Sequence, residues 1–395
     1  YFYTNENAPR GRVVSTPAAN PGAWSEIIPE RDAVLSGVSV VGGRIFAHYM
    51  KDVKSAIRLH ALDGAALGEV ALPGIGAAGG FHGEPDDGET FFSFESFNRA
   101  PTIYRYDIAA GKQSIFREAK APFDPNGYEV RQVFYPSKDG TKIPMFIAHK
   151  RGLDVRDGAP ALLYGYGGFN VPLPPAFSVT RLQWMEMGGV LAVANLRGGG
   201  EYGKTWHDAG RLMNKQNVFD DFIAAAEYLI AEGITRADKL AIQGGSNGGL
   251  LVGAVINQRP DLFAAGLPAV GVMDMLRFNQ FTAGRFWVDD YGDPANEADF
   301  RNLLAYSPLH NIRAGADYPA ILVATADTDD RVVPGHSFKY AAALQAADIG
   351  PKPHLIRIET RAGHGAGKPT DKIIEEYADL WAFAAAQTGL KPPAA

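Results

Sequence analysis

The chain contains the segment Leu240-Ala241-Ile242-Gln243-Gly244-Gly245-Ser246-Asn247-Gly248-Gly249-Leu250-Leu251-Val252. An apolar run leads into a glycine-rich turn with one serine at its tip, and a second apolar run of helical length follows. This is the G-x-S-x-G nucleophile elbow in a strand-turn-helix setting, with Ser246 exposed at the top of a sheet. The turn is so tight that it leaves almost no room for side chains beside the serine, and we expect this to be the reason for glycine at positions 244, 245, 248 and 249.

The prediction of a nucleophile elbow depends on the residues on either side of the turn, because a bare G-x-S-x-G is common in a chain this rich in glycine. Residues 239–243 have the pattern of a buried strand, and residues 250–258 have that of a helix ended by Arg259-Pro260. Both flanks match what an elbow requires.

Composition and charge exclude several classes of site and partner. The 395 residues are 46% hydrophobic, carry a formal net charge of -6 and include no cysteine. The length predicts two domains, and the mild, dispersed charge argues against nucleic acid or a membrane surface as a partner. Without cysteine there is no disulfide, thiolate metal site or cysteine nucleophile. We expect a soluble monomer without cofactor or metal, with the cytoplasm favoured and the periplasm possible if a signal peptide precedes this chain.

Residues 1–116 have the pattern of short strands separated by turns, and they contain a repeat. Gly42-Gly43-Arg44-Ile45-Phe46 matches Gly88-Glu89-Thr90-Phe91-Phe92 at an offset of 46 (88 − 42), and Ile57 matches Ile103 at the same offset. In an all-β region this period indicates four-stranded propeller blades, with a simple meander as the alternative. Two and a fraction blades would leave a sheet edge exposed, so we expect the chain to be the C-terminal part of a longer protein.

The pattern changes near residues 120–127, where we place the domain boundary: 1–121 as a partial propeller and 122–395 as a catalytic domain. A hairpin over 130–135 and 143–148 comes first. Strands are then predicted over 161–164, 190–195, 239–243, 320–324 and 355–358, and further helices over 218–230 and 373–383. This alternation predicts an α/β fold, a doubly wound and mostly parallel sheet of the α/β-hydrolase type.

A serine nucleophile requires a base, and the base requires a carboxylate to orient it. In α/β-hydrolases the chain order is Ser, Asp, His. We expect surface or capping roles for His336 and His354, whereas His364 lies on a glycine-rich loop after a strand and is the predicted base. The acid is expected in the cluster that follows strand 320–324, and spacing does not choose among its members, Asp327, Asp329 and Asp330.

The anionic intermediate of acyl transfer needs hydrogen-bond donors. The backbone N–H of Asn247 is one expected donor, and the loop over 164–169 should supply the other, from its backbone or from a tyrosine hydroxyl. A second glycine pattern, G-x-G-x-x-G at 198–203, resembles a dinucleotide site, but residues 204–207 separate it from the next helical pattern. We therefore predict no nucleotide there.

Taken together, five segments resemble the prolyl oligopeptidase family of serine peptidases, which cut short peptides after proline. They are Tyr164-Gly165-Tyr166-Gly167-Gly168-Phe169, Asn195-Leu196-Arg197-Gly198-Gly199-Gly200-Glu201-Tyr202-Gly203, Gly244-Gly245-Ser246-Asn247-Gly248-Gly249, Asp329-Asp330-Arg331-Val332-Val333-Pro334 and Ala362-Gly363-His364-Gly365-Ala366-Gly367. The resemblance implies an α/β-hydrolase domain capped by a seven-bladed propeller, of which this chain lacks roughly the first half.

The resemblance also implies roles for individual residues. Ser246 would be the nucleophile, Asp329 the acid and His364 the base, with the hydroxyl of Tyr166 beside Asn247 in the oxyanion hole. In the substrate pocket Arg331 would bind a carbonyl and Trp287 would stack on the proline ring. The rest of the pocket would be Phe169, Val272, Tyr291 and Val332.

Two alternatives stay open. One is an oligopeptidase of another specificity, for basic residues or for acylated N-termini; an acidic side chain in the pocket would favour the first, and Trp287 speaks against it. The other is a catalytically silent fragment that acts as a binding module. Short proline-containing peptides are the expected partners of the favoured interpretation.

Overall fold

The computed structural model describes residues 1–365 and 367–391, which form two compact units. The first unit comprises Tyr1–Arg131, Pro172–Leu182 and Gly200–Trp206, and the second comprises Gln132–Val171, Gln183–Gly199 and the chain from His207 onward. The predicted domain division at 121/122 stays a prediction. Among the described residues, no helix combines the length and the hydropathy needed to cross a bilayer.

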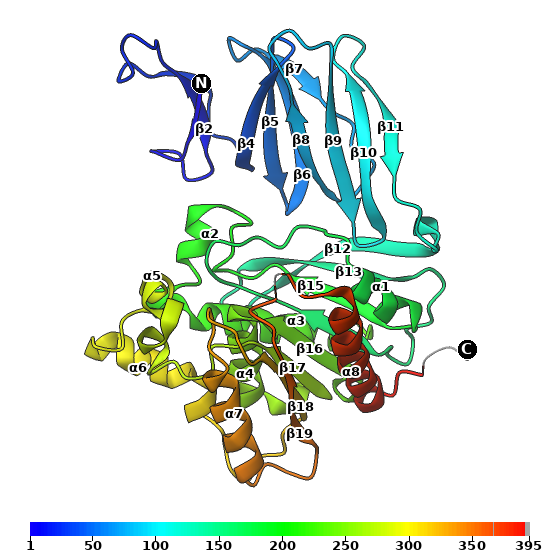
Figure 1. Cartoon of the computed structure of the whole chain (residues 1–395), viewed down its shortest axis with the longest axis vertical. Helices are drawn as coiled ribbons and strands as arrows, with labels where there is room; N and C mark the ends of the chain where they lie inside the picture. The colour runs from blue at the N-terminus through cyan, green and yellow to red at the C-terminus, as the bar shows by residue number, and fades with distance from the viewer. Residues whose placement is uncertain (366, 392–395) are drawn as a thin grey trace. The chain divides into compact units, whose positions relative to one another are not determined.

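The first unit is built from antiparallel sheets, drawn from blue to cyan in Figure 1. A three-stranded sheet has the order β1-β2-β3, and two four-stranded sheets have the orders β4-β5-β6-β7 and β11-β10-β9-β8. The strands are β1 Phe2–Thr4, β2 Arg12–Ser15, β3 Ser25–Ile28, β4 Val34–Val41, β5 Arg44–Lys51, β6 Lys54–Ala61, β7 Ala66–Glu69, β8 Ala77–His82, β9 Glu89–Ser96, β10 Arg99–Asp107 and β11 Lys112–Glu118. Four-stranded sheets in succession are propeller blades, which confirms the partial propeller.

Aromatic rings fill the core between the two four-stranded sheets. Phe81 of β8 stacks on Phe46 of β5 with ring centroids 5.1 Å apart, and on Phe92 of β9 at 4.6 Å. All three side chains are buried. Along β9 buried residues alternate with more exposed ones, as expected for a pleated strand with one face on the core.

The predicted offset of 46 fails by one residue in one pair of strands and holds in the next. β5 begins at Arg44 and β9 at Glu89, an offset of 45 (89 − 44), so the predicted match of Phe46 with Phe92 is wrong. The pairing of β10 then shifts register between Arg99 and Thr102, so Ile103 pairs with Ser93 as Ile57 pairs with His48, and these two isoleucines match at the predicted 46. Ile57 is buried in the core between the two sheets, whereas Ile103 is 40% exposed because it lies on the other face of its sheet.

The second unit is organised around an eight-stranded sheet with the order β12-β13-β15-β14-β16-β17-β18-β19. Its strands are β12 Tyr128–Pro136, β13 Lys142–Lys150, β14 Ala161–Tyr164, β15 Val190–Ala194, β16 Leu240–Gly245, β17 Ala265–Ala269, β18 Ala320–Ala326 and β19 His354–Glu359. β13 is antiparallel to β15, and the pairs from β15 through β14 to β19 are parallel. The mostly parallel α/β sheet is therefore confirmed.

The helices of Figure 1 are α1 Val179–Glu186, α2 Lys204–Asp208, α3 Gln216–Ala231, α4 Asn247–Gln258, α5 Val288–Tyr291, α6 Glu297–Tyr306, α7 Gly335–Ala346 and α8 Thr370–Thr388. Short 3-10 turns are η1 Pro125–Gly127, η2 Leu212–Asn214, η3 Ala237–Lys239, η4 Pro260–Leu262, η5 Phe278–Gln280, η6 Thr282–Phe286 and η7 Pro308–His310.

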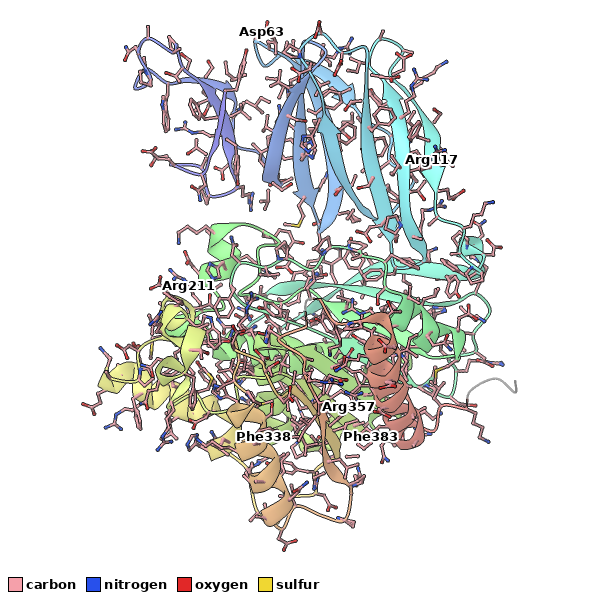
Figure 2. The ribbon with its side chains drawn as sticks, viewed as in Figure 1. Asp63, Arg117, Arg211, Phe338, Arg357 and Phe383 are labelled. Atoms are coloured by element: carbon pink, nitrogen blue, oxygen red, sulfur yellow. The ribbon has the colours of Figure 1, made fainter. Side chains whose placement is uncertain are left out.

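In the second unit the helices pack on the sheet in two groups. α4 lies on β16 and β17 and contacts α3. α8 also lies on β16 and β17, and its Trp381 meets Trp184 of α1 with ring centroids 5.5 Å apart. Arg357 of β19, labelled in Figure 2, pairs with Asp379 of α8 at 2.8 Å. Because the strands are parallel, the loops after β14, β16, β18 and β19 leave the same edge of the sheet, where such folds place their sites.

Candidate active site

Ser246 occupies the turn between β16 and α4 in a conformation that few residues other than glycine adopt. Its φ is 59° and its ψ is -120°. A Cβ on Gly244 would lie 2.3 Å from the carbonyl oxygen of Gly248, and one on Gly248 would lie 2.7 Å from the carbonyl oxygen of Gly165. Both glycines are thus required by close backbone approach. At Gly245 the nearest atom would be 3.9 Å away, so the expectation that all four glycines are sterically required is wrong there.

Asp329 and His364 meet where the loops after β18 and β19 come together. The Nδ1 atom of His364 lies 2.7 Å from Oδ2 of Asp329. The other carboxylate oxygen, Oδ1, accepts the backbone N–H groups of Arg331 and Val332, each at 3.0 Å. The carboxylate is 3% exposed and therefore held rigidly. Among the described residues there is no hydrogen bond between His364 and Ser246.

The contacts distinguish the three aspartates that spacing left open. Asp327 is exposed at the loop surface and accepts the backbone N–H of Ala362 at 3.4 Å. Thr328 binds the carbonyl oxygen of Ala362 through its hydroxyl at 2.7 Å. Asp330 is exposed. Asp327 and Thr328 thus join the two loops, and of the three carboxylates Asp329 is the one against the imidazole. Ala366, from the same motif as His364, lies outside the described residues.

His336 is not at the surface, which corrects the expectation for this residue. It is fully buried near the start of α7, where its Nδ1 accepts the backbone N–H of Asp274 at 3.1 Å. Burial lowers the pKa of His336 to about 4, so the ring stays neutral at physiological pH. A sequence shows that a helix begins here but not which way its first turn faces.

Two donors surround Ser246. The Tyr166 hydroxyl belongs to the loop after β14, and Tyr166 lines the same cavity as Ser246. Burial raises the pKa of Tyr166 to about 12. The Tyr166 hydroxyl therefore stays protonated at physiological pH and can donate a hydrogen bond. Asn247 is the first residue of α4, so its backbone N–H has no partner within the helix. Its buried side chain donates from Nδ2 to the carbonyl oxygen of Tyr166 at 2.5 Å. This bond joins the loop after β14 to the start of α4, which form the two walls of the site around Ser246.

A cavity of about 280 Å³ opens beside the serine. It is lined by Tyr166, Phe169, Ser246, Val272, Ala283, Trp287, Tyr291 and Arg331. Every residue of this set except Ala283 was predicted for the site from the sequence. Val332, also predicted for the pocket, is buried outside the lining and contributes its N–H to Asp329 instead.

Ring contacts and one carboxylate hold the aromatic wall of this cavity. Phe278 stacks parallel to Trp287 and meets Tyr291 edge-on, and Phe169 meets Tyr291 edge-on at 5.3 Å. Asp290 is 3% exposed and accepts the backbone N–H of Phe169 at 3.2 Å. His207 places its Nε2 2.6 Å from the same carboxylate. Sequence reasoning missed the roles of Asp290 and His207, although Asp290 is adjacent to Tyr291 in the chain.

The G-x-G-x-x-G segment serves the same loop network. A Cβ on Gly198 would lie 2.9 Å from the carbonyl oxygen of Gly167, which follows Tyr166. A short helix, α2, does begin directly after the pattern, so the reason given for rejecting a nucleotide site, the absence of a helix there, is wrong. The described residues contain no group of three or more His, Asp and Glu side chains arranged to hold a metal ion.

A serine on a strand-to-helix turn, with a carboxylate–imidazole pair on later loops of a mostly parallel sheet, defines the α/β-hydrolase class. The chain belongs to the prolyl oligopeptidase family. Residues 175–391 match the model of the prolyl oligopeptidase family, and residues 1–119 match that of the prolyl oligopeptidase N-terminal beta-propeller domain.

Known proteins resemble nearly all of this chain. A prolyl endopeptidase of Elizabethkingia miricola is 50% identical over 394 residues, which are 99% of this chain and 56% of that protein. A solved prolyl endopeptidase is 47% identical with a TM-score of 0.95, covering 98% of this chain and 58% of its own. Oligopeptidase B of Leishmania major is 27% identical with a TM-score of 0.91, covering 98% of this chain and 56% of its own. The chain thus spans about half the length of the curated relatives it matches.

Proposed function

We propose that the chain is a serine endopeptidase that hydrolyses short peptides on the carboxyl side of proline. The observation that carries the proposal is the cavity of about 280 Å³, which brings Ser246 together with the aromatic ring of Trp287. The membership of the chain in the prolyl oligopeptidase family supports it. The protein would act as a monomer on its peptide substrates.

The reaction is acyl transfer in two halves. The Oγ of Ser246 attacks the peptide carbonyl carbon while its proton moves to Nε2 of His364, whose Nδ1–H points to Asp329. Tyr166 and the N–H of Asn247 donate to the oxyanion. The imidazolium then protonates the leaving amine. Water, deprotonated by the same histidine, attacks the acyl carbon; the bond to Oγ of Ser246 breaks, the imidazolium returns its proton to Oγ, and the carboxylic acid leaves.

The absence of a hydrogen bond between Ser246 and His364 among the described residues is compatible with this chemistry. Catalytic hydrogen bonds are commonly long before substrate binds and tighten in the complex. The loop that carries His364 contains glycines at 363, 365 and 367. Such a loop can adjust its backbone so that Nε2 reaches the hydroxyl when a peptide fills the cavity.

The shape and charge of the cavity favour proline over a basic residue. At about 280 Å³ it is slightly below the ~300 Å³ lower bound of pockets for drug-sized ligands, and it suits one compact side chain. No acidic side chain is among its lining residues, and its one charged member is Arg331, which would repel lysine or arginine. An aromatic wall recognises an apolar ring without needing a hydrogen bond.

The test is active-site labelling followed by a substrate panel. A fluorophosphonate probe should label the folded chain and should not label Ser246→Ala, with Ser178→Ala as the matched serine control. Peptides with Pro, Arg or acetyl-Ala before the scissile bond should be cut in that order of preference. No labelling of folded protein would favour a silent fragment instead, and preference for Arg would favour the sibling specificity.

A further inference from the structure

A buried lysine lies directly behind the proposed oxyanion hole. Lys215 precedes α3 and is 1% exposed. Its Nζ donates to the carbonyl oxygen of Gly167 at 2.9 Å and to Oδ1 of Asn247 at 3.0 Å. The ammonium also lies 5.3 Å from the centre of the Tyr291 ring. Among the described residues it makes no direct ion pair with a carboxylate.

Holding a charge in this place is unfavourable for the fold. Burial lowers the pKa of Lys215 to about 8, and the charge of Asp290 offsets part of that effect. A lysine kept in a dry site without a carboxylate partner destabilises the folded state while it is charged. Such groups are concentrated at functional sites, which favours a role for Lys215 in activity.

The partners of Lys215 belong to the two walls that carry the proposed oxyanion donors. Gly167 directly follows Tyr166, and Asn247 supplies the backbone N–H. The Asn247 side chain closes the connection, because its Nδ2 donates to the carbonyl oxygen of Tyr166 at 2.5 Å. Its Oδ1 also accepts the Tyr291 hydroxyl at 3.0 Å, so the pocket wall joins the same cluster.

We propose that Lys215 is a positioning residue for the oxyanion hole. Its ammonium binds both walls and so fixes the separation of the Tyr166 hydroxyl and the Asn247 N–H before the tetrahedral intermediate forms. The inference rests on the proposed peptidase function and extends it to a residue outside the triad and the pocket. A donor pair fixed in advance stabilises the developing oxyanion without reorganising during the reaction.

The surrounding segment anchors this lysine. Arg211, labelled in Figure 2, donates from Nη1 to the carbonyl oxygen of Asp289 at 2.9 Å. Asn302 of α6 donates to the carbonyl oxygen of Leu212 at 2.9 Å. The turn before Lys215 is therefore tied to α5 and α6, so the ammonium is delivered from a fixed backbone.

The test compares Lys215→Met with Lys239→Met. Lys239 also donates to two backbone carbonyls, those of Asp157 and Gly158, but it precedes β16, at the end of the strand away from Ser246. Lys215→Met should lower kcat for a proline peptide amide by about 10- to 100-fold, below the ~100- to 1,000-fold loss of a direct oxyanion donor. KM should stay within about twofold, and Lys239→Met should leave both constants unchanged.

A second readout separates positioning from a merely structural role. A peptidyl prolinal forms a tetrahedral adduct with the serine, whereas the matching peptidyl pyrrolidide fills the pocket without one. Lys215→Met should lower the affinity for the aldehyde by the same factor by which it lowers kcat, and it should leave the affinity for the pyrrolidide unchanged. Equal weakening of both inhibitors, or an unchanged kcat, overturns the proposal.

Two further outcomes, a variant that does not fold and a wild type that is not labelled, also decide the proposal. If Lys215→Met does not fold, the same criteria apply to Lys215→Gln, which is polar and closer to the lysine in hydrogen-bonding capacity. If the wild-type chain is folded but is not labelled by the fluorophosphonate probe, the proposed function fails, and the role of Lys215 fails with it. If the probe labels the wild type and the Lys215 variant keeps its kcat, the role of Lys215 is rejected while the proposed function stands.

Discussion

Replacing Asp329 by asparagine should abolish most of the activity without changing the fold. Oδ1 of Asp329 accepts two backbone N–H groups at 3.0 Å each, so the amide oxygen of the asparagine must occupy that place. The amide NH₂ then faces Nδ1 of His364, which lies 2.7 Å from Oδ2 in the wild type. Nδ1 must therefore accept a hydrogen bond, and the ring proton moves to Nε2. An imidazole protonated on Nε2 cannot take the proton of Ser246.

The expected loss follows from this forced tautomer. In other Ser-His-Asp enzymes the same exchange lowers kcat by about 10⁴-fold, which corresponds to about 5.4 kcal/mol of transition-state stabilisation. The asparagine cannot avoid it by rotating its amide, because NH₂ would then face two N–H donors. We therefore expect a fall in kcat close to 10⁴-fold and a KM within about threefold of wild type, since Asp329 does not line the cavity.

Steady-state hydrolysis of a proline peptide amide measures both constants, and thermal unfolding checks the fold. The matched controls are Asp327→Asn and Asp330→Asn, which change the neighbouring carboxylates that face solvent. Both should retain most of the wild-type kcat. The reasoning is refuted if Asp329→Asn keeps more than a tenth of the wild-type kcat while folded, or if Asp330→Asn loses as much activity.

Three further predictions concern the surroundings of the serine. Tyr166→Phe should lower kcat by about 10²- to 10³-fold with little change in KM, and because the pKa of Tyr166 is about 12, wild-type activity should show no loss from this group up to about pH 10. Trp287→Ala should raise KM for proline peptides by about 10- to 100-fold, and an equal effect on a peptide without proline would contradict its proposed role. Arg197→Met should destabilise the fold by about 3–5 kcal/mol in denaturant unfolding, because it leaves the fully buried carboxylate of Asp221 without the partner 2.6 Å away; a change below about 1 kcal/mol would contradict this reading.

The sequence was informative about the site wherever chemistry demands a particular residue. A tight turn around Ser246 and a histidine after a late strand are local signals, and the family motifs placed most of the cavity lining in advance. The role of Lys215 left no such signal, because a lysine just before a helix usually faces solvent. Its burial follows from how the turn before α3 meets the loop after β14, and a contact of that kind depends on tertiary packing.

The fold was predictable where hydrophobic periodicity was strong. β14 coincides with the predicted 161–164, and α4 with the predicted helix apart from its first turn. β17 was missed, because Gly266 and Pro268 interrupt its short apolar run. The offset of the repeat changes from 45 to 46 residues after β9, where the pairing of β10 shifts register between Arg99 and Thr102. A simple sequence offset does not show such a shift, and one residue reverses the face of a strand, so the predicted match of Phe46 with Phe92 failed.

Two of the ten described residues other than glycine that have a positive φ lie at the proposed active site, beside buried polar groups. Ser246 and Phe169, with φ values of 59° and 56°, are residues other than glycine in the left-handed region, and both line the cavity. Such conformations cost about 1–3 kcal/mol each and persist only where the surroundings over-determine them. Here the surroundings include Asp290, which holds the N–H of Phe169, and Lys215, which holds the residue next to the serine. Packing alone would favour relaxed backbone and apolar side chains at these positions, so their joint presence supports the proposed function, in which donors and pocket rings are held in place before a peptide binds.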